Sequence, residues 1–141
     1  MIINVDALIN ELKQDEGWRP SAYYDTEGFL TIGFGFMIDE AKSGQLPMPV
    51  AEFWLLHNIK SLTATLSVAL PNWSKYPDQL QRALINMAYQ MGISGLLGFK
   101  RMIAAIDARN YELAATEALD SKWSKQTPNR ARRVAEMIRT A

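Results

Sequence analysis

The sequence predicts an α+β protein that is mostly helical, with one small antiparallel sheet near its N-terminus. Three observations support this fold class. Apolar residues recur at helical spacing through most of the chain, strand-like alternation is confined to about residues 22–34, and Gly and Pro separate the helical segments. With 141 residues, 48% of them hydrophobic, the chain is long enough to bury one sizeable core, so we expect a single domain.

The first helix is predicted from about Val5 to Glu16. Apolar residues recur there every three or four positions, Asn4 is placed to cap the start, and Gly17 is placed to end the helix in a left-handed turn. A small antiparallel hairpin should follow, with strands over about 22–24 and 29–34 on either side of a D-T-E-G turn.

The middle of the chain is predicted to contain a bend, a loop and a long helix. Gly33 and Gly35 indicate a bend where the second strand leaves the sheet. Asp39–Pro49 mixes charges, glycine and proline, which is typical of a loop. Helical periodicity without breakers then predicts one helix over about 50–70, which Pro71 stops.

The rest of the chain is predicted to be helical. One buried helix should run over about 77–91 and end at Gly92, with short turns at Gly95 and Gly98. Thr127 and Pro128 have the chemistry of an N-cap and a first helical turn. Further helices are therefore predicted over about 100–108, 111–120 and 128–140.

Composition excludes several classes of function. No segment approaches the roughly 18 consecutive apolar residues of a membrane span, and the charged N-terminus lacks the pattern of a signal peptide. We therefore expect a protein made in the cytoplasm with no stable membrane insertion. The absence of cysteine excludes disulfides and thiol catalysis, and with His57 as the single histidine a His-based metal site is not expected.

Charge is unevenly spread along a chain whose net charge is zero. Residues 1–99 hold six basic against ten acidic residues, whereas residues 100–141 hold nine basic against five acidic. The basic C-terminal segment, residues 100–141, is able to attract an anionic polymer such as cell wall or nucleic acid. The simpler interpretation is a solvated surface of mixed charge, and no groove-reading motif supports nucleic-acid binding.

The most informative stretch for function lies between Glu16 and Gly35. It places two carboxylates, Glu16 and Asp25, and the hydroxyl of Thr31 around a helix end and a hairpin. Cleavage of a glycosidic bond needs one carboxylic acid to protonate the leaving oxygen and one carboxylate to activate water or stabilise the oxocarbenium ion. By position alone, Glu16 is also an ordinary surface glutamate and Asp25 an ordinary turn former.

Three blocks in this order resemble the T-even bacteriophage lysozymes of glycoside hydrolase family 24. They are residues 16–35, the block A-L-I-N-M-A-Y-Q-M-G at 83–92, and the block Q-T-P-N-R-A-R-R-V at 126–134. The resemblance implies a lysozyme-like fold in one domain, in which a linking helix over about 50–70 joins an N-terminal lobe (14–50) to a helical C-terminal lobe (71–141). It also implies that the first helix packs on the C-terminal lobe.

The resemblance also implies roles for individual residues. Glu16 matches the proton donor, Asp25 the second catalytic carboxylate, and Thr31 the threonine that helps to hold the attacking water in an inverting reaction. Arg130 matches an arginine that approaches the acid. Residues that match cleft-lining, substrate-binding positions are Glu27, Tyr89 and Gln90.

The chain departs from the family pattern at several places. Phe36 stands where the family often has a histidine, and two substrate-contacting positions of the T-even enzyme fall at Met102 and Glu117, which are different residue types. Roles at these positions are therefore not carried over. Residues 39–74 match the family pattern poorly, and this region is shorter than the corresponding region of the T-even enzyme.

The resemblance implies a muramidase that hydrolyses the β-1,4 bond between N-acetylmuramic acid and N-acetylglucosamine in peptidoglycan, without metal or cofactor. It implies a monomeric phage endolysin that stays in the host cytoplasm until a separate holin releases it to the periplasm. The sequence equally suits a phage-tail component that pierces the cell wall, or a secreted effector cut from a longer chain. The alternative is a non-catalytic peptidoglycan-binding or scaffold module with the same fold. The presence of all three residues, Glu16, Asp25 and Thr31, argues against that alternative.

Overall fold

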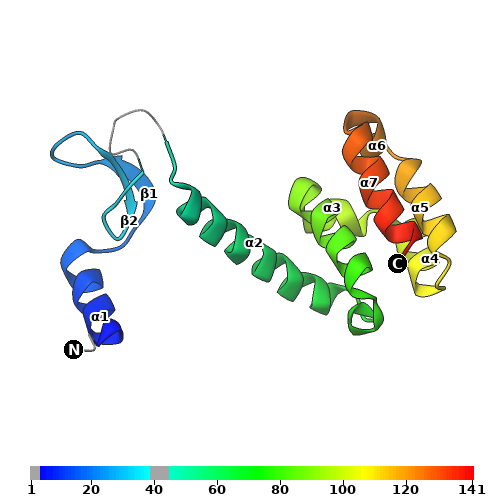
Figure 1. The fold of residues 1–141 in the computed structure, drawn as a ribbon, viewed down its shortest axis with the longest axis horizontal. Helices are drawn as coiled ribbons and strands as arrows, with labels where there is room; N and C mark the ends of the chain where they lie inside the picture. The colour runs from blue at the N-terminus through cyan, green and yellow to red at the C-terminus, as the bar shows by residue number, and fades with distance from the viewer. Residues whose placement is uncertain (1–3, 39–44) are drawn as a thin grey trace. The chain divides into compact units, whose positions relative to one another are not determined.

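The computed structural model describes residues 4–38 and 45–141 (Figure 1). The chain forms two compact units, a first unit of Met1–Trp54 and a second unit of Leu55–Ala141. The described residues are mostly helical and contain one small sheet, which confirms the predicted fold class. The elements are α1 (Val5–Glu16), β1 (Arg19–Tyr24), β2 (Leu30–Gly33), β3 (Phe36–Met37), α2 (Met48–Ala69), the 3₁₀ turn η1 (Trp73–Lys75), α3 (Asp78–Leu97), α4 (Lys100–Asp107), α5 (Tyr111–Leu119), α6 (Lys122–Gln126) and α7 (Pro128–Arg139).

Helix α1 begins and ends where the sequence predicts. The Asn4 side chain accepts a hydrogen bond from the Ala7 N–H at 3.1 Å, which satisfies one of the free donors of the first turn. At the other end Gly17 adopts φ 72° and its N–H donates to the Lys13 carbonyl. The helix therefore stops at Glu16, and its last side chain stands at the start of the sheet.

The sheet has three antiparallel strands in the order β1-β2-β3. Thr31 on β2 pairs with Tyr23 on β1 and with Met37 on β3. The predicted hairpin and the predicted bend at Gly33 and Gly35 are confirmed, but the chain does not leave the sheet there, because it returns as β3. Gly33 and Gly35 both have φ near +70°, and this left-handed backbone turns the chain back on itself to form β3.

Helix α2 confirms the long helix of the middle region, with an earlier start than predicted. It begins at Met48 rather than Val50, because Pro49 in a first turn costs no intrahelical hydrogen bond. Most of the predicted loop, residues 39–44, lies outside the described residues. In the parts of the chain that the structure describes, no helix is long and apolar enough to cross a membrane.

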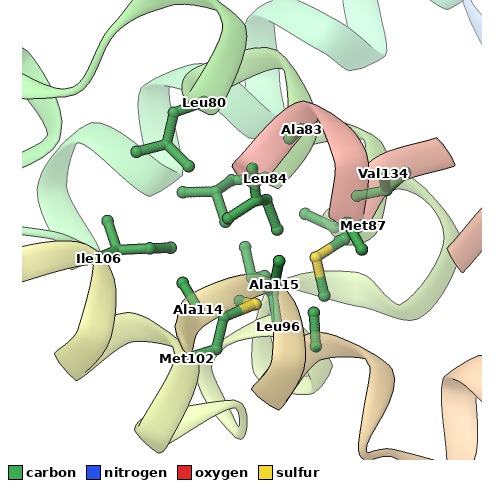
Figure 2. Packing of buried hydrophobic residues seen from close by; sticks show 14 of the residues in the cluster. Leu80, Ala83, Leu84, Met87, Leu96, Met102, Ile106, Ala114, Ala115 and Val134 are labelled. Carbon is green, nitrogen blue, oxygen red and sulfur yellow. The ribbon is translucent and has the colours of Figure 1, made fainter. Parts of the chain in front are cut away.

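The core of the second unit is built where α3, α4, α5 and α7 meet (Figure 2). Leu80, Leu84 and Met87 follow one face of α3 and are fully buried. Alanines at the contact surfaces of α5 and α7 allow the helix backbones to approach closely, which keeps the packing dense. Other fully buried members of this cluster are Leu66, Leu96, Met102, Ile106 and Ile138.

Two predictions for the second unit need correction. The helix that starts near Pro77 does break at Gly92, which has φ 80°, but a further helical segment continues to Leu97 and includes Gly95. The five-residue helix α6 and the turn η1 were not predicted. Thr127 does occupy the N-cap position of α7, but its hydroxyl donates to the Trp123 carbonyl instead of capping the helix.

The stability of the second unit should depend on pH through the ionisation of a buried tyrosine, Tyr76. The Tyr76 hydroxyl donates to an Asp107 carboxylate oxygen at 2.6 Å. Burial first, and then this hydrogen bond, raises the pKa of Tyr76 above its ordinary value. The folded state therefore keeps a proton that the unfolded state loses above about pH 10, so stability should fall as the pH rises through that range.

The variant Tyr76→Phe should lose about 1–2 kcal/mol of unfolding free energy at pH 7. It should also show a smaller further loss between pH 9 and pH 11 than the wild type, because phenylalanine has no proton to release. Urea unfolding at these pH values measures both effects. An equal alkaline loss in both proteins would show that Tyr76 does not cause it.

Candidate active site

Glu16 is the last residue of α1, and its exposed carboxyl group lies against the turn between β2 and β3. A Cβ atom added to Gly35 would collide with Oε2 of Glu16 and would lie 3.0 Å from its Cδ. Gly35 also has φ 72°, a conformation that other residues adopt with strain. The glycine therefore leaves the space in which the carboxyl group sits, a feature that the sequence pattern alone did not reveal.

The variant Gly35→Ala should lose activity beyond its loss of stability. We expect about 1–2 kcal/mol of destabilisation from the left-handed backbone, and displacement of the Glu16 carboxyl by the new methyl group. Gly92→Ala is the matched control, because Gly92 has φ 80° but open space around the added Cβ. If both variants retain the same activity at equal folded fraction, the position of Glu16 does not depend on Gly35.

Asp25 organises the turn between β1 and β2. Its Oδ1 accepts hydrogen bonds from the N–H groups of Glu27 at 2.9 Å and Phe29 at 2.8 Å. Its own N–H donates to the Phe29 carbonyl at 2.9 Å. The turn-forming interpretation of Asp25 is therefore correct, and it is compatible with chemistry, because both side-chain bonds use one of the two carboxylate oxygens.

Thr31 is anchored to the same residue as Asp25. It is 3% exposed in the middle strand, and its hydroxyl donates to the Phe29 carbonyl at 3.0 Å. With its proton used in this bond, the Thr31 oxygen keeps lone pairs that are able to accept a hydrogen bond from water. Phe29 therefore links the hydroxyl of Thr31 and the carboxylate of Asp25. Glu27 is exposed in the turn beside them.

The remaining predicted site residues lie in the second unit. Arg130 donates from Nε to Oδ1 of Asn86 at 2.9 Å and from a terminal nitrogen to the Asn86 carbonyl at 3.0 Å. Tyr89 is half exposed on α3. Arg130 and Tyr89 line one cavity of about 370 Å³. The approach of Arg130 to Glu16 stays a prediction.

Gln90 has a structural partner that sequence reasoning missed. Its Oε1 accepts a hydrogen bond from Nε1 of Trp123 at 2.8 Å, so the tryptophan fixes which end of the amide remains for a ligand. The hydrogen bonds between Asn86 and Arg130 were also not predicted. The available signal for such a partner was a polar side chain on an otherwise apolar helix face, because a partly buried polar group needs a hydrogen-bond partner.

Two of the three departures from the family pattern line the same cavity in the second unit. Met102 is buried on α4 and Glu117 is half buried on α5, and both line a cavity of about 740 Å³ with Trp123. Phe36 is exposed at the start of β3 in the first unit. Within residues 4–38 and 45–141, no three His, Asp or Glu side chains are grouped in a way that would hold a metal ion.

The phage lysozyme family model matches residues 13–139 of the chain. The match includes the carboxylates, Thr31, and the second-unit residues described above. The chain belongs to the phage lysozyme family.

The relatives differ in how much of their own length the match covers. A Dictyostelium discoideum protein named "Probable T4-type lysozyme 1" is 32% identical over 96% of this chain and 95% of its own length. The pre-baseplate central spike protein of Enterobacteria phage T4 is 32% identical over 95% of this chain and 28% of its own length. A peptidoglycan hydrolase of Pseudomonas phage phiKMV is 29% identical over 86% of this chain and 14% of its own length.

Proposed function

We propose that this protein hydrolyses the β-1,4 bond between N-acetylmuramic acid and N-acetylglucosamine in peptidoglycan. Membership of the phage lysozyme family, and relatives named as lysozymes and as a peptidoglycan hydrolase, support a hydrolase that acts on peptidoglycan. The observation that carries the proposal is the arrangement of three groups in the first unit. Glu16 is an acid at a helix end, and Phe29 joins the carboxylate of Asp25 to the hydroxyl of Thr31.

In the proposed reaction Glu16 protonates the leaving glycosidic oxygen as the bond breaks. Glu16 ends α1 beside the turn between β2 and β3, and its carboxyl group is exposed, so it is able to reach a bound glycan. Asp25 takes a proton from the attacking water, and the Thr31 oxygen accepts a hydrogen bond that orients this water. We also propose that Arg130 approaches Glu16. The residues proposed to bind the glycan are Glu27, Tyr89 and Gln90.

Asp25→Asn separates turn formation from chemistry. Asparagine keeps an oxygen that accepts from the Glu27 and Phe29 N–H groups, so stability should change little. It has no charge with which to take a proton from water, so activity should fall by about 10²- to 10⁴-fold. Thermal unfolding and hydrolysis rates measure the two effects. Full activity in a folded Asp25→Asn protein would limit Asp25 to forming the turn.

The experiment that tests the proposed reaction is digestion of peptide-free glycan strands followed in real time by proton NMR. An inverting enzyme that cleaves a β-linkage should release new reducing ends in the α-form first, before mutarotation mixes the anomers. Early β-anomer would instead indicate retention. If no reducing ends form although the glycan binds, the chain is a non-catalytic peptidoglycan-binding module.

The biological setting proposed is host lysis by a monomeric endolysin. It would be held in the bacterial cytoplasm and released to the periplasm through a separate holin. Expression in the cytoplasm of a bacterium should then cause lysis only when a holin is co-expressed. Lysis at the same rate without a holin would contradict this setting without affecting the proposed reaction.

A further inference from the structure

Three aromatic side chains, of which Trp18 and Phe36 are exposed and Phe34 is partly buried, form a patch in the first unit. Trp18 and Phe34 have ring centroids 5.1 Å apart, and Phe34 and Phe36 meet edge to face at 6.3 Å. Trp18 is 64% exposed and Phe36 is 60% exposed. We call Trp18, Phe34 and Phe36 the aromatic patch. A cluster of exposed apolar side chains marks a surface that binds a protein, a membrane or a ligand.

The aromatic patch is built on the same turn that receives the Glu16 carboxyl. A Cβ added to Gly33 would lie 2.9 Å from the Phe36 ring and 3.8 Å from the Trp18 ring, whereas one added to Gly35 would meet Glu16. The aromatic rings lie beside Gly33 and the carboxyl group lies beside Gly35. Two residues of chain span at most about 7 Å, so these two places on the turn are no farther apart than this. A ligand of one or two sugar rings is long enough to reach both.

A cation completes the patch. The Lys13 ammonium lies 5.6 Å from the centroid of the Phe34 ring, within the range of a cation–π contact. Lys13 is one turn before Glu16 on α1, so both side chains project toward the same turn. The ammonium offers hydrogen-bond donors at the edge of the aromatic surface.

We propose that the aromatic patch is a subsite for one pyranose ring of the glycan that Glu16 cleaves, with the ring stacked on Trp18 and its polar edge near Lys13. A pyranose presents C–H groups on its faces and hydroxyl or acetamido groups at its edge. An aromatic face with a donor beside it matches this chemistry. The proposal rests on the proposed function for its choice of ligand, since the patch adjoins the proposed acid.

The test uses the inactive Glu16→Gln protein for binding and the Glu16-containing protein for kinetics. Peptide-free N-acetylglucosamine–N-acetylmuramic acid strands are added to ¹⁵N-labelled Glu16→Gln protein, and the indole N–H signal of Trp18 is followed. The signal is assigned by its loss in Trp18→Phe. We expect it to shift on binding, and an unmoved Trp18 signal at saturating glycan would overturn the proposal.

Kinetics then separate a sugar contact from a packing role. Trp18→Ala should raise KM for the strands by about tenfold with little change in kcat, whereas Trp18→Phe, which keeps a ring, should remain near wild type. Tyr24→Ala, at an exposed aromatic outside the patch, is the control and should leave KM unchanged. A loss of kcat or of thermal stability in Trp18→Ala without a change in KM would show that the patch serves packing and overturn the proposal.

Failure of this proposal and failure of the proposed function give different results. If the wild-type protein hydrolyses glycan but Trp18→Ala leaves KM unchanged, the reaction stands and the subsite is wrong. If the wild-type protein does not hydrolyse glycan but the Trp18 indole shifts on adding it, the subsite stands and the reaction is wrong.

Discussion

Replacing Glu16 with glutamine is expected to lower the rate of peptidoglycan hydrolysis by about two to four orders of magnitude, the usual contribution of a general acid. Glutamine keeps the size and shape of the side chain that lies against Gly35, but it has no acidic proton to give to the leaving oxygen. Stability should change little, because Glu16 is exposed at the end of α1. Binding of the glycan should also persist.

A matched substitution shows whether this loss is specific. Glu11→Gln removes the same charge from another exposed position of α1, and we expect it to leave the rate within about twofold of wild type. Release of reducing sugar from purified peptidoglycan measures all three proteins. Should Glu16→Gln and Glu11→Gln retain similar rates, the acid lies elsewhere in the chain.

Leu84→Ala is expected to cost about 2–5 kcal/mol of unfolding free energy in the second unit. Leu84 is 0% exposed and lies at the centre of the cluster in Figure 2, among side chains from several helices. Truncation removes apolar contacts and leaves a cavity that the closely packed helices cannot fill by collapse. The expected loss is a large fraction of the total stability of about 5–15 kcal/mol that is typical of a domain.

The control for this prediction is Leu113→Ala on α5, where the leucine is 45% exposed and less contact area is lost. Its cost should stay near or below about 1 kcal/mol. Urea unfolding followed by tryptophan fluorescence reports on the second unit through the buried residues Trp73 and Trp123. Equal midpoints for the two variants would contradict the placement of Leu84 at the centre of the core.

The sequence predicts the elements whose signals are local. Asn4 and Gly17 define both ends of α1, and Pro71 follows the end of α2, because caps and breakers act within one helical turn. The missed elements are short. Strand β3 has two residues and α6 has five, too few for any periodicity, and they form because of contacts with the rest of their unit. The second helical segment after Gly92 was missed because a glycine with positive φ normally ends a helix.

The sequence proposes the members of the candidate site but not the contacts that they make. The catalytic roles of Glu16, Asp25 and Thr31 stay predictions, whereas the contact between Gly35 and the Glu16 carboxyl appears only when the turn is folded beside α1. The bonds from Arg130 to Asn86 and from Trp123 to Gln90 join residues 44 and 33 positions apart. No local pattern encodes such pairs. The packing of the first helix on the C-terminal lobe stays a prediction.

The most direct test of the central claim is identification of the new chain ends after peptidoglycan digestion. Purified Gram-negative peptidoglycan is treated with wild-type or Glu16→Gln protein, the reducing ends are fixed with borohydride, and the fragments are identified by mass spectrometry. We predict reduced muramic acid at the new ends with the wild type, and almost no new ends with the variant. Reduced glucosamine at the ends, or undigested peptidoglycan that sediments with both proteins, would contradict a muramidase that uses Glu16 as its acid.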